Sequence, residues 1–161
     1  MTKHVAFLMG GWSSEREVSL NSGKACADAA ERAGYRVTRI DVARNVATVL
    51  DELRPDAAFN ILHGRPGEDG TIQGILEVLG IPYTHSGVQA SSLAMKKDAA
   101  KVMLAAAGVP VPQGRAISRF EAGKAHVLPR PYVIKPIAEG SSVGGFIVTD
   151  NPDLAARAVL L

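Results

Sequence analysis

Three segments of the chain combine glycines with charged or polar side chains at spacings that suit a small ligand. They span residues 10–20 (GGWSSEREVSL), 62–77 (LHGRPGEDGTIQGILE) and 135–145 (KPIAEGSSVGG). Glycines let a ligand approach the backbone closely, and a helix start or a tight turn offers free amide groups. The chemistry of this chain is therefore expected in these segments.

The first segment places a carboxyl group shortly after two glycines. Glu15 would repel a phosphate, and the segment does not match G-x-G-x-x-G, so a dinucleotide site is disfavoured. A cation such as an amino group suits this carboxyl group better. The alternative is that Glu15 and Glu17 are ordinary acidic residues in the first turn of a helix.

The second segment is a loop that holds three glycines and a proline within eight residues. His63 stands at the expected carboxyl end of a strand, the edge at which open α/β sheets bind their ligands. A structural hydrogen-bonding role is the alternative for this histidine. Asp69 or Gly70 is expected to cap the helix that follows.

The third segment is a glycine-serine turn between two expected strands. Its amide groups can form an anion-binding nest, and Lys135 adds a charge that suits phosphate. Residues 140–144 also match G-x-S-x-G, but all four histidines precede this motif and a strand is expected after it, which excludes a serine-hydrolase site. A plain β-hairpin turn remains the alternative.

Alternating strand and helix patterns position the first two segments. The expected strands span residues 4–9, 35–42, 57–62 and 82–84. The first expected helix is capped by Ser13 or Ser14 and ends at Ala33, and two further helices are expected over 46–53 and 71–79. One face of the first helix is expected to pack on the sheet through Val18, Ser22, Ala25, Ala29 and Ala33. This order predicts an α/β fold with an open parallel sheet and helices on both faces.

The chain changes character after residue 90, so we expect an N-terminal domain over 1–90 and a second part over 91–161. The second part should begin with a long helix over 91–107. Strands are then expected over 114–118, 131–135 and 145–150, and a helix is expected to start at Asn151-Pro152.

Composition argues against several classes of protein. The 18 basic and 16 acidic residues are scattered along the chain, and aromatic residues make up 5%. The loose cluster of Lys96, Lys97 and Lys101 therefore suits a solvated helix face or a small anion rather than nucleic acid. No apolar run reaches the ~20 residues of a membrane span, and no secretory signal is recognisable. The one cysteine, Cys26, fits a reducing compartment, so a cytoplasmic protein is expected.

Taken in order, four motifs resemble those of the D-alanine–D-alanine ligases, members of the ATP-grasp superfamily. They read GGxSxEREVSL, LHGxxGEDGxxQGxLE, SGVxAS and KPxxEGSSVG, and together they extend over essentially the whole chain. The resemblance implies a Rossmann-like pre-ATP-grasp domain, followed by the α+β central subdomain of an ATP-grasp fold in truncated form. It implies that ATP phosphorylates one D-alanine and that the amine of a second D-alanine attacks the acyl phosphate, for peptidoglycan synthesis.

The resemblance also implies roles for individual residues. Glu15 is implied to be a catalytic residue that anchors the ammonium group of the first D-alanine, and Val18 and His63 are implied to line the same subsite. Ser141 is implied to be a second catalytic residue, which links Glu15 to a loop that closes the site. The ATP-binding residues implied are two lysines and the glycine-rich turn: Lys97, Lys135, Glu139, Gly140, Ser141, Ser142 and Gly144. The family usually has aspartate at the position of Lys96, so either Lys96 or Lys97 is the first of these lysines.

The resemblance implies Mg²⁺ or Mn²⁺ as the cofactor. Its ligands are expected beyond Leu161, so no metal site is expected within residues 1–161. The implied partners are two D-alanine molecules, ATP and a second copy in a homodimer, without nucleic acid or membrane. Because the metal-binding and adenine-binding parts would also follow Leu161, the fragment alone is expected to be inactive. A non-catalytic binding or dimerisation fragment, and a D-alanine–D-lactate type of ligase, remain alternatives.

Overall fold

The structure, a computed structural model, describes residues 2–122, 126–140 and 144–149. The chain divides into two compact units, Met1–Leu93 and Ala94–Leu161. The segments at 10–20 and 62–77 lie in the first unit, and the segment at 135–145 lies in the second.

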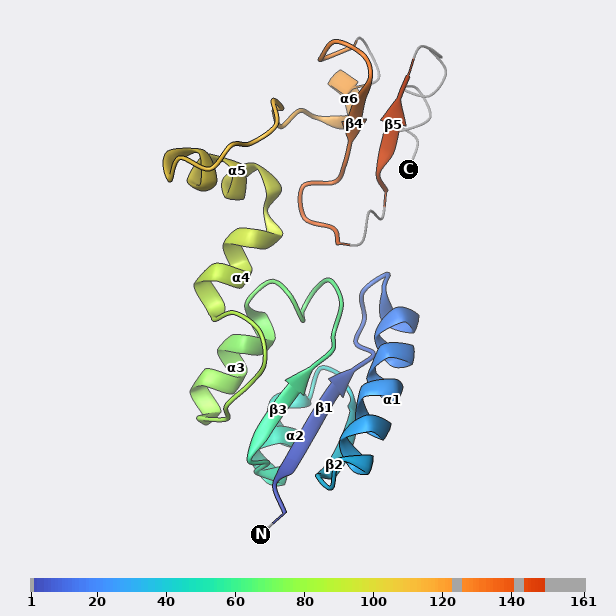
Figure 1. Cartoon of the computed structure of the whole chain (residues 1–161), viewed down its shortest axis with the longest axis vertical. Helices are drawn as coiled ribbons and strands as arrows, with labels where there is room; N and C mark the ends of the chain where they lie inside the picture. The colour runs from blue at the N-terminus through green and yellow to red at the C-terminus, as the bar shows by residue number, and fades with distance from the viewer. Residues whose placement is uncertain (1, 123–125, 141–143, 150–161) are drawn as a thin grey trace. The chain divides into compact units, whose positions relative to one another are not determined.

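The first unit is built on a three-stranded parallel sheet with the order β2-β1-β3 (Figure 1). β1 spans His4–Met9, β2 spans Arg36–Asp41 and β3 spans Ala57–Asn60. The central strand β1 is a continuous apolar run, as a parallel strand buried on both faces requires. In place of the strand expected at 82–84, a single parallel bridge joins Tyr83 to Ala58.

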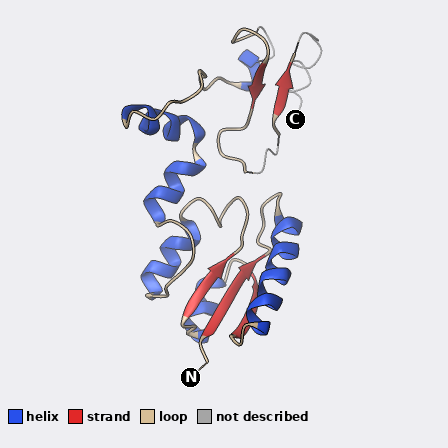
Figure 2. Cartoon of the chain, in the orientation of Figure 1, coloured by secondary structure: helices blue, strands red, loops and turns tan. Residues whose placement is uncertain are grey.

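Helices cover both faces of this sheet, as the sequence predicts (Figure 2). α1 (Arg16–Arg32) packs on one face, and α2 (Val46–Leu53) and α3 (Thr71–Leu79) pack on the other. The larger core lies on the side of α2 and α3, and its buried members are Ala6, Leu8, Ile40, Val42, Val46, Leu50, Ala58, Leu62, Ile72, Leu76 and Ile81. Phe7, Ala27 and Ile61 form a smaller core under α1.

The expected packing face of α1 is wrong. The helix buries Ser19, Gly23 and Ala27, whereas Val18 is 50% exposed. Gly23 sets this face, because a Cβ atom there would lie 2.6 Å from the Cβ atom of Met9 on β1. The helix axis can therefore approach the strand most closely at this glycine, which turns the alanines of the expected face toward solvent.

The start of α1 also differs from the expectation. The helix begins at Arg16, and its N-cap residue, Glu15, makes no side-chain capping bond. Ser13 is not the cap: its hydroxyl group accepts a hydrogen bond from the Glu15 amide and donates one to the His63 carbonyl. The Ser13 hydroxyl group thus makes one local bond just before the helix and one bond to a distant loop.

The expected long helix over 91–107 is two helices, α4 (Val88–Met95) and α5 (Lys97–Ala106). Lys96 separates them with an extended backbone, at φ −92° and ψ 97°. Residues 114–118 contain no strand. α6 (Arg119–Ala122) precedes an antiparallel pair formed by β4 (Tyr132–Ile134) and β5 (Phe146–Val148). This pair agrees with the two strands expected on either side of the glycine-serine turn. The helix expected from Asn151 lies outside the described residues.

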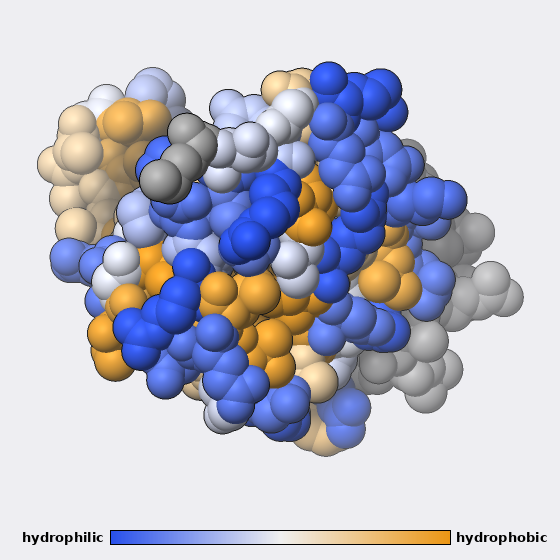
Figure 3. Space-filling view, turned by 90° about the horizontal axis from the view of Figure 1, so that it is seen from below, coloured by the Kyte–Doolittle hydropathy of each residue, from blue (hydrophilic) through white to orange (hydrophobic). Residues whose placement is uncertain are grey.

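The side of the molecule on which β1 begins is mainly hydrophilic, with hydrophobic residues exposed between the polar ones (Figure 3). The loops of the first two motifs lie at the opposite end of the sheet, where β1 and β3 end (Figure 1). Among the residues that the structure describes, no helix has both the length and the apolar character needed to cross a membrane.

Candidate functional site

Two loops meet at the carboxyl edge of the parallel sheet. One follows β1 and leads into α1, and the other follows β3 and leads into α3. The Ser13 hydroxyl group joins them, donating a hydrogen bond of 2.7 Å to the carbonyl oxygen of His63. The first two sequence motifs therefore form one site, as expected for neighbouring parallel strands that end at the same edge.

Glu15 is the most unusual residue of this site. Its side chain is 3% exposed, and neither carboxyl oxygen has a hydrogen-bond partner among the described residues. The carboxyl group lies against Gly64, where an added Cβ atom would be 3.0 Å from the Glu15 Oε2 atom. Because a buried charge without a partner is costly, this carboxyl group is suited to a cation that is supplied from outside.

The other expected members of this subsite are placed less tightly. His63 is half-buried at the start of the second loop, directly before the glycine that contacts Glu15. Val18 lies three residues after Glu15 on α1 and is exposed. The structure thus brings Glu15 and the His63–Gly64 segment together.

Two amide side chains that the sequence analysis did not single out shape the second loop. Asn60 Nδ2 and Gln73 Nε2 both donate to the carbonyl oxygen of Gly67, at 2.8 and 2.7 Å. Both side chains are 1% exposed. A polar residue at the end of an otherwise apolar strand was the available signal for Asn60, since a buried amide must find partners.

Charged residues hold the same loop from the solvent side. The Glu68 Oε2 atom accepts from the Gly64 amide at 2.6 Å, and Asp69 accepts from Arg65 and from the Thr71 amide. Burial alone would raise the pKa of Asp69, but the hydrogen bonds from Arg65 and Thr71 lower it below its usual value. Of the two residues expected to cap α3, Gly70 is the N-cap residue, and Asp69 satisfies the first amide of the helix from the position before it.

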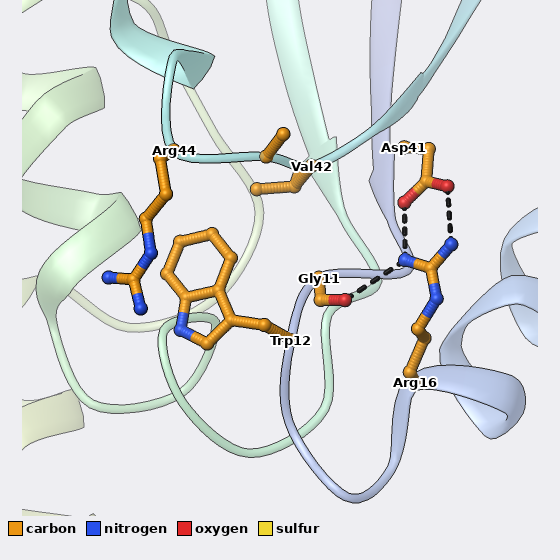
Figure 4. A pocket seen from close by; sticks show the side chains of 7 residues that line it. Gly11, Trp12, Arg16, Asp41, Val42 and Arg44 are labelled. Atoms are coloured by element: carbon orange, nitrogen blue, oxygen red, sulfur yellow. Dashed lines mark hydrogen bonds and ion pairs between the residues drawn. The ribbon is translucent and has the colours of Figure 1, made fainter.

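A shallow cavity of about 410 Å³ lies beside the first loop (Figure 4). On one side of it, Arg16 holds both oxygens of Asp41 at 2.6 Å and donates to the Gly11 carbonyl at 2.9 Å. This guanidinium holds the pKa of Asp41 below its usual range. On the other side, the Arg44 guanidinium lies 4.1 Å from the centre of the Trp12 ring.

The residues expected to bind ATP lie in the second unit. Lys97 begins α5, and its ammonium group donates to the carbonyl of Glu139, while its amide donates to the carbonyl of Ile137 at 3.1 Å. Lys96 is exposed and shows no such contact, so the geometry favours Lys97 over Lys96. Lys135 is exposed after β4.

The glycine-serine turn is described only in part. Glu139 and Gly140 precede the undescribed residues, and Gly144 follows them with a φ of +64°, a conformation that favours glycine. Ser141 and Ser142 lie outside the described residues. Within the described part of the chain no three metal-binding side chains gather.

A parallel sheet covered on both faces, with its candidate site in the loops at the carboxyl edge, is the architecture of Rossmann-like α/β proteins.

A family model described as "D-ala D-ala ligase N-terminus" matches residues 47–86. Two proteins named D-alanine–D-alanine ligase are close in sequence. The one from Rhodopseudomonas palustris (strain BisB18) is 70% identical over 148 residues, which cover 92% of this chain and 48% of that protein. The one from Xanthobacter autotrophicus is 71% identical over 151 residues, 94% of this chain and 49% of that protein.

Solved structures of D-alanine–D-alanine ligases are also similar to this chain. The D-alanine–D-alanine ligase from Bacillus anthracis matches with a TM-score of 0.77 at 33% identity, covering 97% of this chain and 52% of that one. The D-alanine–D-alanine ligase from Coxiella burnetii gives a TM-score of 0.71 at 27% identity. The chain is thus similar to one half of the D-alanine–D-alanine ligases, and it spans about half the length of the curated relatives it matches.

Proposed function

We propose that this chain provides the N-terminal part of an ATP-dependent ligase that joins two D-alanine molecules for peptidoglycan synthesis. The observation that carries the proposal is the Glu15 carboxyl group, which is buried at the meeting point of two loops with no partner among the described residues. An amino acid supplies the ammonium group that such a site lacks. The relatives named as D-alanine–D-alanine ligases support D-alanine as that amino acid.

In this proposal the first unit is the Rossmann-like pre-ATP-grasp domain, and it binds the first substrate. Glu15 holds the ammonium group, so that the substrate carboxylate points away from Glu15 toward the phosphoryl donor. His63 and Val18 line the subsite. Holding the reacting carboxylate in one orientation is the main contribution of such a site, because phosphoryl transfer depends on positioning and on charge neutralisation.

The second unit is, in this proposal, the start of the central ATP-grasp subdomain. Lys97 and Lys135 provide positive charge, and the amides around Gly140 and Gly144 contact the phosphates of ATP. The Lys97 ammonium group supports this role, because it already lies against the segment that leads into the glycine-serine turn. Ser141 and Ser142 would complete the turn, and Mg²⁺ would be held by residues outside this chain. A cytoplasmic homodimer is part of the same proposal.

The test joins this chain to the C-terminal half of the Rhodopseudomonas palustris relative and measures phosphate release and dipeptide formation with ATP and D-alanine. Glu15→Gln should lower kcat/KM for the first D-alanine by roughly 30- to 5,000-fold, because losing one partner of a buried charge pair costs about 2–5 kcal/mol. The KM for ATP should change by less than about threefold.

Glu17→Gln is the matched control, since Glu17 is an exposed acid in the first turn of the same helix. It should behave like the unmodified enzyme. Equal losses for D-alanine and ATP in Glu15→Gln would contradict the anchoring role. No ATP-dependent product from the folded, unmodified enzyme would favour a non-catalytic fragment, and a product with D-lactate in second position would favour the other type of ligase.

A further inference from the structure

Two serines connect the first loop to the end of β3 by the same arrangement of hydrogen bonds. The Ser19 hydroxyl group, which is fully buried, accepts from the Gly10 amide at 2.9 Å and donates to the Ile61 carbonyl at 2.7 Å. The Ser13 hydroxyl group accepts from the Glu15 amide at 3.1 Å and donates to the His63 carbonyl at 2.7 Å. We call these two hydroxyl groups the serine bridges.

The serine bridges begin where the sheet ends. The paired register of β1 and β3 closes at Leu8 and Asn60, with one further bond of 2.8 Å from the Ile61 amide to the Leu8 carbonyl. Beyond this point the two segments separate into loops, and their backbone groups need other partners. Ile61 and His63 are two residues apart, the spacing at which carbonyl groups of extended chain point the same way.

Neither bridge is an ordinary helix cap. A capping serine accepts from an amide two or three residues further along its own helix, as a local contact. Ser13 makes such a local bond with the Glu15 amide, but the donor bonds of Ser13 and Ser19 span 50 and 42 residues of sequence. What these bonds fix is the separation between the loop that carries Glu15 and the loop that carries His63.

We propose that Ser13 and Ser19 are positioning residues that hold the two substrate loops together and so set the Glu15 carboxyl group against Gly64. As a statement about substrate, this inference rests on the proposed function. Ser13 acts at the site itself, because its hydroxyl group binds the Glu15 amide directly. Ser19 acts one step further from the site, at the base of both loops.

The first experiment follows amide hydrogen exchange by NMR in the 161-residue chain. Ser13→Ala should speed exchange at the Glu15 and Gly64 amides by about tenfold, the effect of removing one hydrogen bond that holds a local structure closed. Amides of β1 should not change. Ser14→Ala is the control, because Ser14 is the exposed neighbour of Ser13, and it should leave all of these rates unchanged.

The second experiment uses the joined enzyme described above. Ser13→Ala should raise the KM for the first D-alanine by about tenfold and leave the KM for ATP within about twofold, and Ser13→Thr, which keeps the hydroxyl group, should restore most of the loss. Ser19→Ala should show the same split together with a lower Tm, because its hydroxyl group is fully buried.

The outcomes separate the two proposals. If the unmodified joined enzyme does not use D-alanine, the proposed function fails, while the exchange experiment still tests the bridges. If that enzyme is active but Ser13→Ala changes neither KM, or both equally, the positioning role is refuted. Unchanged exchange at Glu15 and Gly64 in Ser13→Ala would overturn the bridge itself.

Discussion

Gly67→Ala tests how tightly the second loop is packed. A Cβ atom at Gly67 would lie 2.1 Å from the Cβ atom of Leu62 and 3.0 Å from the Leu62 backbone carbon atoms. Leu62 is a buried member of the larger core and cannot move aside without disturbing it. The carbonyl group of Gly67 also receives the amides of Asn60 and Gln73, so a shift of this backbone strains two further bonds.

The size of the effect follows from these contacts. Overpacking a well-packed site costs about 1–3 kcal/mol, and weakening two buried hydrogen bonds adds about 1 kcal/mol. The expected loss in the free energy of unfolding is therefore about 2–4 kcal/mol. For a unit of about 90 residues this lowers the Tm by roughly 10–25 °C.

The assay uses the fluorescence of Trp12, which is the only tryptophan of the chain and lies in the first unit. Its signal in urea and thermal unfolding reports this unit. Gly74→Ala is the matched control: Gly74 lies inside α3, and an added Cβ atom there meets nothing within 4 Å. This control should stabilise the unit by about 0.5–1 kcal/mol, because alanine favours a helix over glycine. A cost below about 0.5 kcal/mol for Gly67→Ala, or a destabilising Gly74→Ala, would refute the packing argument.

Two further predictions concern the sheet. Burial and the nearby Arg36 lower the pKa of His4 below the ordinary value of about 6.5 for a histidine. The contribution of His4 to the free energy of unfolding should therefore be greatest above about pH 6.5. It should fall as the pH drops toward the lowered pKa, because the unfolded chain takes up the proton first. Urea titrations at pH 7.5 and 5.5 should show this loss, and His4→Gln should remove it. Gly23→Ala should destabilise the first unit by about 1–3 kcal/mol in the same unfolding assay, because its Cβ atom would meet Met9 at 2.6 Å, and a cost near zero would show that α1 can move away from β1.

The alternation of strands and helices in the first unit could be predicted because the local signals agree. The apolar run of β1, the helix ending at Gly80 and the pattern of α2 each point to one structure, and the observed bounds match the expected ones closely. The packing face of α1 could not be predicted in this way. Its small residues distinguish the faces weakly, and the close approach at Gly23 depends on a strand rather than on the helix itself.

The second unit was harder to predict because its elements are short and lack such signals. Neither glycine nor proline marks the break between α4 and α5, and the structure places it at Lys96. The sequence predicts a strand over residues 114–118, but a strand forms only where another one pairs with it, and the described residues provide none there.

The meeting of Glu15 with the His63–Gly64 segment could be predicted, since both follow strands that end at the same edge. The supporting residues could not. Ser19 and Asn60 are ordinary polar residues in the sequence, and their roles appear only when the partners of their hydrogen bonds, distant along the chain or in a folded loop, are known.

The supporting residues also explain why Glu15 remains without a partner. Two side-chain donors close to Glu15 in sequence are already engaged with a backbone carbonyl group or with another carboxylate. The Ser13 hydroxyl group donates to His63, and Arg16, the residue next to Glu15 in sequence, is held by Asp41 and Gly11. No neighbouring cation of the described residues neutralises the Glu15 carboxyl group, which is therefore available to an ammonium ligand. A buried carboxyl group without a partner selects for a cationic group at that point, and the ion pair with Asp41 keeps the Arg16 guanidinium from taking that role.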